Sequence, residues 1–246
     1  MSRQIRREIA SDDAETCAKG LRRLAQLLGT DSVSNLRPDD WQQKRDELAD
    51  LQDRILQLAA NDEEMLRELT ADALGGWLGD EALEALLILA RDPVERVRAS
   101  AVGSLEYWPD RESAHDALLE GASAKQWTVR MRAARAMAAH TSAETLDALF
   151  ECLVDPDSYV RNNAAESLKR RDTATFLPRL RKMQREYPAP QMLDCAIELL
   201  GAVGTPEDGE FLAKVGSWLN LSQPGFVRTW ARRAAKQIKL RHVAKP

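Results

Sequence analysis

The chain has 246 residues, of which 44% are hydrophobic and only 5% aromatic, and its formal net charge is −4. This length can bury a substantial core, and a chain rich in Ala and Leu but poor in aromatic residues favours helices over sheets. The longest strictly apolar run, Ala85–Ala90, is far too short to cross a bilayer. Cys17, Cys152 and Cys195 form no CxxC pair and no secretory signal is present, so we expect reduced thiols and a cytoplasmic location.

Charge is distributed unevenly along the chain. Asp39–Glu84 contains fourteen acids and four bases, whereas Gly225–Pro246 contains seven Lys or Arg residues and no acid. In an elongated molecule this distribution makes one end acidic and the other basic. The simpler interpretation is a solvated acidic face and a solvated basic end helix.

The first sixty residues predict two helices. One runs from about Asp12 to Leu28, and a longer charged one runs from Asp39 to about Ala60, with the loop "GTDSVSNLRPDD" between them. We expect residues 1–61 to form an atypical capping hairpin, as end repeats usually do. Residues 62–246 are then a repeat array that is continuous with this cap.

The rest of the chain repeats a nine-residue block that is apolar at its first position and small at its fifth. The first positions are Leu66, Val97, Val129, Val160, Met192 and Val227. Each block opens a helix, and a second apolar-periodic helix fills the gap before the next block. We expect Asp80, Ser142 and Thr205 to cap helix N-termini. A hairpin of this length buries its apolar faces only by stacking on its neighbours, which predicts an all-α solenoid of about six hairpins.

The pattern "VRxxAAxxL" after "DP" is clearest in Asp92–Leu105 and Asp155–Leu168. It resembles HEAT repeats, specifically the short HEAT-like repeats associated with phycobilin lyases. The resemblance implies a right-handed superhelix in which the recurring Arg belongs to a ladder between repeats. The ladder residues in this sequence are Asp92, Arg98, Asp155 and Arg161. Ala124 stands where an Asp would precede Arg130, so Arg130 is expected to have lost its partner and to be available for another role.

Positions three, four, seven and eleven of each block point away from the core side of the helix. In a HEAT-type stack this row lines the concave face, where partners bind. The small residues Ala99, Ser100 and Gly103 leave room there for a partner's side chain. The alternative is an ordinary solvated helix face. The candidate partner-binding residues are Tyr107, Arg132, Arg135, Asn162, Asn163, Glu166, Arg170, Trp230 and Arg233.

No residue pattern supports catalysis or metal binding. His115, His140 and His242 are far apart in the sequence, His115 has the pattern of a surface helix histidine, and no metalloprotease, nucleotide-binding or nucleophile motif is present. His140 occupies the same block position as Trp77 and Trp108, on the buried side. We therefore predict no catalytic residue, no metal ligand and no cofactor.

The leading hypothesis is a non-enzymatic scaffold that binds an extended or helical segment of another protein through its concave face, as a monomer and without contacting a membrane. A nucleic-acid-binding protein resembling HEAT-like DNA glycosylases is the second hypothesis. It is favoured by the basic C-terminal helix and by Trp127 and Trp230 beside arginines, and opposed by the acidic balance. A bilin lyase or bilin-binding protein is the third, and the resemblance alone implies it.

Overall fold

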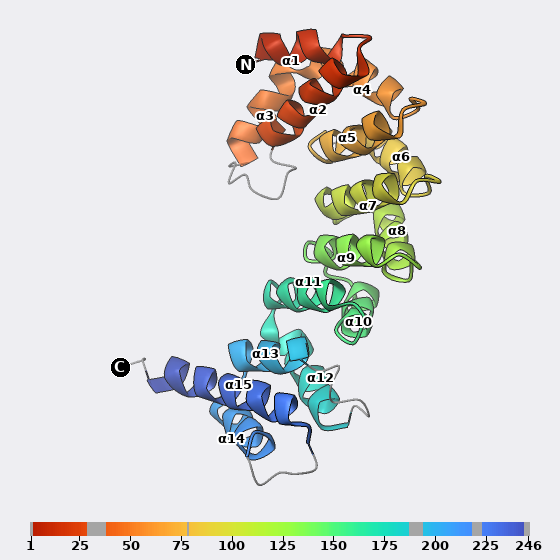
Figure 1. The fold of residues 1–246 in the computed structure, drawn as a ribbon. Helices are drawn as coiled ribbons and strands as arrows, with labels where there is room; N and C mark the ends of the chain where they lie inside the picture. The colour runs from red at the N-terminus through yellow and green to blue at the C-terminus, as the bar shows by residue number, and fades with distance from the viewer. Residues whose placement is uncertain (1, 29–37, 78, 187–193, 218–222, 244–246) are drawn as a thin grey trace. The chain divides into compact units, whose positions relative to one another are not determined.

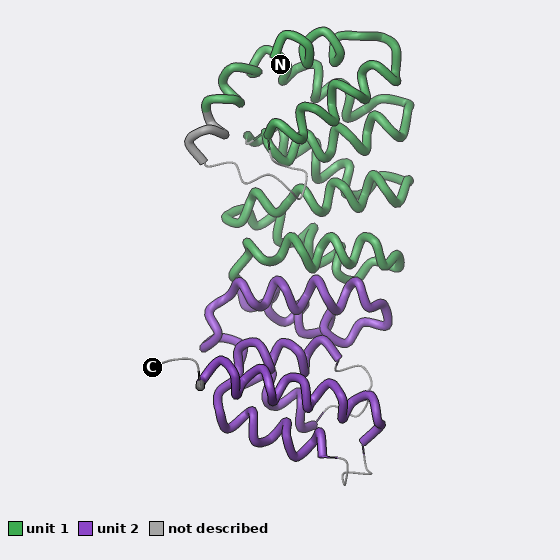
Figure 2. Tube along the Cα trace, turned by 60° about the vertical axis from the view of Figure 1, so that its left-hand side comes forward, with its two compact units in different colours: residues 1–141 green, residues 142–246 purple. Residues whose placement is uncertain are grey.

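The computed structural model describes residues 2–28, 38–77, 79–186, 194–217 and 223–243, and within these ranges all regular elements are helical (Figure 1). The chain divides into two compact units, residues 1–141 and 142–246 (Figure 2). The expected boundary near residue 61 concerns a different division, between cap and repeats, and stays a prediction. No helix among the described residues is long and apolar enough to cross a membrane.

The helices of the first unit are α1 (Ser2–Ile9), α2 (Ala14–Leu28), α3 (Pro38–Glu47), α4 (Gln52–Leu58), α5 (Glu64–Gly75), α6 (Asp80–Leu89), α7 (Glu95–Ser104), α8 (Glu112–Ala122) and α9 (Trp127–Ala136). The short 3₁₀ helices η1 (Ala49–Leu51) and η2 (Leu105–Tyr107) follow α3 and α7. The helices of the second unit are α10 (Ala143–Cys152), α11 (Ser158–Lys169), α12 (Thr173–Glu186), α13 (Asp194–Val203), α14 (Pro206–Val215) and α15 (Gly225–Val243).

The N-terminal part differs from the expectation in two ways. An additional helix, α1, precedes the predicted pair, and its Ile5 and Ile9 are fully buried. The single helix expected from Asp39 to Ala60 is instead broken at η1. The reason is tertiary: α3 packs on α2, whereas α4 packs on α5 and α6, and one straight helix cannot follow both surfaces. Most of the expected loop, residues 29–37, lies outside the described residues.

Among the described residues each unit contains three helical hairpins, and in the first unit α1, α2 and α3 precede them. In the first unit α5, α7 and α9 pack side by side, and α4, α6 and α8 pair with them. In the second unit α11, α13 and α15 pack in sequence, with α10, α12 and α14 as their partners. The predicted architecture is confirmed: the fold is an all-α solenoid of six hairpins.

The core follows the periodicity of the block. The first positions are all nearly inaccessible wherever they are described, and Met192 lies outside the described residues. All six fifth positions have no exposed surface; they are Thr70, Ala101, Ala133, Ala164, Ala196 and Ala231. A small side chain suits this position because it has no exposed surface and packs inside the helical array. Trp77, Trp108 and His140 are buried too, as predicted.

The predicted N-caps are correct at two of three positions. Ser142 accepts a hydrogen bond from the Thr145 amide, and Thr205 forms a capping box with Asp208. Asp80 is instead the first residue of α6, and Gly79 holds the N-cap position. An acid in the first turn still favours the helix electrostatically, but Asp80 makes no capping bond.

Candidate functional site

Four block arginines share one geometry, in which Nη1 of the guanidinium donates hydrogen bonds to two carbonyls of the preceding turn. Nη1 of Arg67 donates to the carbonyls of Asn61 and Asp62 at 2.8 and 2.9 Å. Nη1 of Arg98 donates to those of Asp92 and Pro93 at 2.7 and 2.9 Å. Arg130 and Arg161 hold the carbonyls five and six residues before them in the same way. These bonds satisfy turn carbonyls that are partly withdrawn from water.

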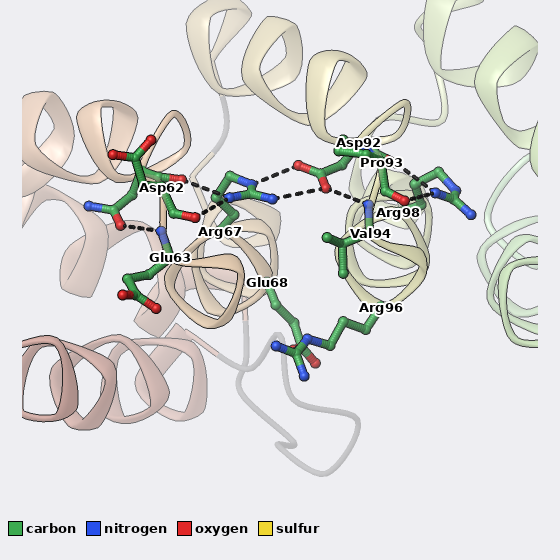
Figure 3. A network of polar contacts seen from close by, with 10 residues as sticks. Asp62, Glu63, Arg67, Glu68, Asp92, Pro93, Val94, Arg96 and Arg98 are labelled. Atoms are coloured by element: carbon green, nitrogen blue, oxygen red, sulfur yellow. Dashed lines mark hydrogen bonds and ion pairs between the residues drawn. The ribbon is translucent and has the colours of Figure 1, made fainter.

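The other edge of the guanidinium reaches the next repeat rather than its own. Nε and Nη2 of Arg67 form a fork with the Asp92 carboxylate at 2.7 and 3.2 Å (Figure 3). Arg161 forms a fork of the same kind with Asp194, with both bonds at 2.8 Å, although Asp194 is the first residue of α13 and not the turn residue that corresponds to Asp92. Asp92 also accepts the Val94 amide at 2.8 Å, which fixes the turn before α7. The ladder therefore runs forward by one repeat.

This register changes the conclusion about the missing carboxylate. Because each fork points to the following repeat, Ala124 lies opposite Arg98 and not opposite Arg130. Arg130 grips the Ala124 and Lys125 carbonyls and has a further interaction, so the expectation that it had lost its partner is wrong. Within the described part of the chain, no carboxylate lies within ion-pair distance of Arg98. Asp155, on the other hand, caps its own turn by accepting the Asp157 amide at 2.8 Å.

In the first unit the predicted row lines a real depression. A cavity of about 430 Å³ opens over α5, α7 and α9, and its walls include Glu68, Ala99, Ser100, Met131 and Arg132. Ala99 and Ser100 are nearly inaccessible because the three helices pack closely. The space that Gly103 leaves is not empty, since the Arg132 side chain lies across it with Cδ 3.3 Å from where a Cβ would stand.

The charged residues that line this cavity pair with residues on the neighbouring helices. Arg96 on α7 pairs with Glu64 and, at 3.1 Å through Nε, with Glu68 on α5. Thr128 at the start of α9 donates to Glu95. Sequence reasoning identified Glu68 in this lining but missed the other four residues, Glu64, Glu95, Arg96 and Thr128. They precede the block by one or two positions, so they lie four residues before positions three and four, and the helical period could have identified them.

Asp72, at the seventh position of the first block, belongs to the same row and is half-buried. Burial raises the pKa of its carboxyl group, and this effect outweighs the nearby Arg132 guanidinium and a hydrogen bond from Ser100, which lower it. Arg135 acts on Asp72 in the same direction as Arg132. Arg132 and Arg135, two of the candidate residues, are both half-buried, and both act to lower the pKa of Asp72.

The remaining candidate residues do not line this cavity. Tyr107 ends η2 in the first unit and is half-buried. On α11, Asn162 and Glu166 are exposed, and Asn163 is half-buried and donates to the Tyr159 carbonyl at 2.8 Å. Arg170, the C-cap residue of α11, is exposed. On α15, Arg233 is exposed and Trp230 packs edge-on against Phe226, with ring centroids 5.1 Å apart. The α11 and α15 residues belong to the second unit and are described only within it.

Two histidines that are far apart in sequence meet in the first unit. The rings of His115 and His140 stand edge to face with centroids 4.7 Å apart. His140 is fully buried and its Nε2 donates to the Leu105 carbonyl at 3.0 Å, while His115 is half-buried and bonds the Pro109 carbonyl. His115 lies on a helix as expected, but it is only half exposed because its ring packs against His140. Among the described residues no group of three His, Cys, Asp or Glu side chains could hold a metal ion.

The described helices, hairpins and ladder define a helical-repeat protein. Residues 83–169 and, in an overlapping placement, residues 115–192 match the family described as HEAT repeats. Over residues 83–192 the chain is thus similar to HEAT repeats, and its fold is that of a HEAT-like repeat protein. No curated protein sequence is similar enough to be counted as a relative.

Solved structures support the same fold. The S. pombe condensin Cnd3–Cnd2 subcomplex is 16% identical with a TM-score of 0.54, over 99% of this chain and 32% of that one. The CpcE–CpcF complex of phycocyanin lyase from Nostoc sp. PCC7120 is 16% identical with a TM-score of 0.52, over 98% and 94%. A designed armadillo repeat protein in complex with peptide (KR)4 is 18% identical with a TM-score of 0.51, over 80% and 98%. These likenesses concern the fold, which is typical of protein-interaction scaffolds.

Proposed function

We propose that this protein is an interaction module that binds an extended or helical segment of a partner protein across α5, α7 and α9. The observation that carries the proposal is the cavity of about 430 Å³ on these helices, because the side chains of three successive repeats converge on it. The similarity to solved repeat proteins in complex with a peptide or with another protein supports a protein partner.

The chemistry of the cavity suits a segment that carries charge and a small apolar anchor. Glu64, Glu95 and Arg132 supply charge of both signs to its lining, and Ala99 and Met131 supply apolar surface. The Arg96 pairs are about half exposed, and such ion pairs contribute only about 0–1 kcal/mol each. A partner's charged side chains can therefore exchange with them at low cost.

The test is affinity capture from the cells of origin with mass spectrometry, comparing the unaltered chain with the Arg132→Glu, Arg135→Glu double variant. We expect a stoichiometric protein partner that the double variant binds about 10-fold or more weakly, since unpairing charges at an interface costs about 2 kcal/mol or more. Thermal unfolding of both proteins shows whether the double variant remains folded.

A matched control reverses two charges away from the cavity. Lys19 on α2 and Lys182 on α12 are 54% and 72% exposed, so Lys19→Glu with Lys182→Glu should leave partner binding unchanged. The proposal fails if the partner binds the Arg132→Glu, Arg135→Glu protein as tightly as the unaltered protein. Equal losses in both double variants would indicate a non-specific charge effect and would also contradict it.

Nucleic-acid binding is a second candidate, favoured by the surface of α15. This helix has no acid, and its exposed bases include Arg232, Arg233, Lys236 and Lys239. Phosphate contacts are strongest at low salt, so a gel-shift experiment with duplex DNA at low ionic strength is decisive. Salt-dependent binding that is lost with Arg233→Glu and Lys236→Glu would support this function, and no binding at low salt would eliminate it.

A further inference from the structure

The ladder has a gap at Arg98, and a cavity of about 350 Å³ lies at the gap. Arg98 grips its turn as the other block arginines do, so its Nε–Nη2 edge is held in the orientation in which Arg67 meets Asp92 (Figure 3). The residue corresponding to Asp92 in the following repeat is Ala124. A methyl group stands where the ladder places a carboxylate.

The cavity is lined by the groups that an acidic side chain would need. Arg98, Lys125 and Arg91 supply positive charge, and Val102 and Gly121 form part of the apolar wall. Glu120 is the acid among the lining residues, and it pairs with Arg91 at 3.3 Å on the surface. A fixed guanidinium edge binds a carboxylate through two parallel hydrogen bonds without first losing side-chain freedom.

We propose that this cavity binds a side-chain carboxylate, Asp or Glu, of a partner protein, which completes the ladder in place of the missing aspartate. The cavity shares no lining residue with the one on α5, α7 and α9, so this site is separate from the proposed function. Its volume lies within the range of ligand pockets, about 300–1,000 Å³, and leaves room for neighbouring partner groups.

The test follows the Nε–Hε signals of the arginines by ¹⁵N NMR while N-acetyl-aspartic acid amide is added, a compound whose one carboxylate is the side chain. We expect a saturable shift of the Arg98 signal, assigned by its loss in Arg98→Lys, with no such shift for Arg67 or Arg161. A single charge-assisted pair implies a dissociation constant on the order of 10 mM or weaker. Titrations with inorganic phosphate and sodium chloride at equal ionic strength distinguish a carboxylate site from a general anion site.

Ala124→Asp supplies the missing carboxylate within the chain. We expect this variant to melt at a higher temperature, to show the Arg98 signal already shifted, and to lose the response to the added compound. Ser113→Asp adds the same charge at an exposed position of α8 outside the cavity, and should keep the response. The proposal is overturned if Arg98 shows no saturable shift, if phosphate or chloride produces the same shift, or if Ala124→Asp lowers the melting temperature.

Discussion

At the scale of single residues, the Arg67–Asp92 pair shows how the ladder stabilises the fold. Burial acts to raise the pKa of Asp92, but hydrogen bonds from the Arg67 guanidinium and the Val94 amide outweigh it and hold the pKa below its usual value. A lowered folded-state pKa means that the carboxylate stabilises the protein at neutral pH. This stabilisation is lost as pH falls through that lowered pKa.

Asp92→Asn tests the charge of this pair, because asparagine keeps the size of the side chain and one acceptor. We expect a loss of about 1–3 kcal/mol in the free energy of unfolding at pH 7, measured by urea denaturation. The difference should shrink toward pH 3 and below, as Asp92 becomes protonated in the unaltered protein. Asp147→Asn is the control: its carboxylate is 64% exposed and pairs with Arg179 on the surface, so the loss should stay below about 1 kcal/mol. A pH-independent difference for Asp92→Asn would contradict the electrostatic explanation.

The thiol of Cys195 provides a second prediction at this scale. Burial raises its pKa to about 12, with Asp194 acting in the same direction, and the thiol donates to Asn162 Oδ1 at 3.1 Å. Because the thiolate is the reactive form, native Cys195 should react with a thiol reagent at pH 8 about 10³-fold more slowly than an ordinary exposed cysteine. Peptide mapping after timed alkylation measures this rate. Labelling as fast as in urea would show that the thiol is accessible.

At the scale of helices, the spacing between the helices that carry the nine-residue block depends on small residues at a few positions. A Cβ added at Gly201 of α13 would stand 2.8 Å from both Cα and Cβ of Ala234 on α15. Backbone atoms cannot move aside as the end of a flexible side chain can. The close approach of α13 and α15 therefore requires glycine at this position.

Gly201→Ala should destabilise the protein by about 1–3 kcal/mol through overpacking, even though alanine favours helices by up to about 1 kcal/mol. Gly225→Ala on α15 is the control, because its added Cβ would meet only an Arg228 nitrogen at 3.8 Å and should be neutral or stabilising. Thermal and urea unfolding measure both effects. A stabilised Gly201→Ala protein would show that α13 and α15 can separate without cost.

At the scale of the whole molecule, helix contacts within each described unit join elements close together in the chain. α5 packs on α7 and α7 on α9, and α13 packs on α15. Stability in such repeat proteins is the sum of local terms and interfaces between neighbours, so one region can open before another.

This locality predicts how the Gly201→Ala effect spreads. Hydrogen exchange measured by mass spectrometry should increase in α13 and α15 and remain unchanged in α5, α7 and α9. The control is Gly225→Ala, which should leave exchange unchanged in both sets of helices. A uniform increase throughout the chain would mean that the protein unfolds as a single cooperative unit, which would contradict the prediction.

The sequence by itself determined the fold class, the six hairpins and the buried block positions. These follow from apolar spacing at the helical period, and Val97 or Ala101 is buried whichever neighbour covers it. The same spacing identified the row on α5, α7 and α9, and extended by one turn it would have included Arg96.

Only the tertiary structure decided which groups meet across the repeats. The fork from Arg67 to Asp92, the placement of Arg132 across Gly103 and the contact between His115 and His140 join residues about 25 to 30 positions apart. Periodicity fixes the side of a helix on which a residue lies, but not the distance or offset between two helices, which side-chain packing sets. For this reason the missing carboxylate belongs opposite Arg98, although the sequence had placed its loss at Arg130.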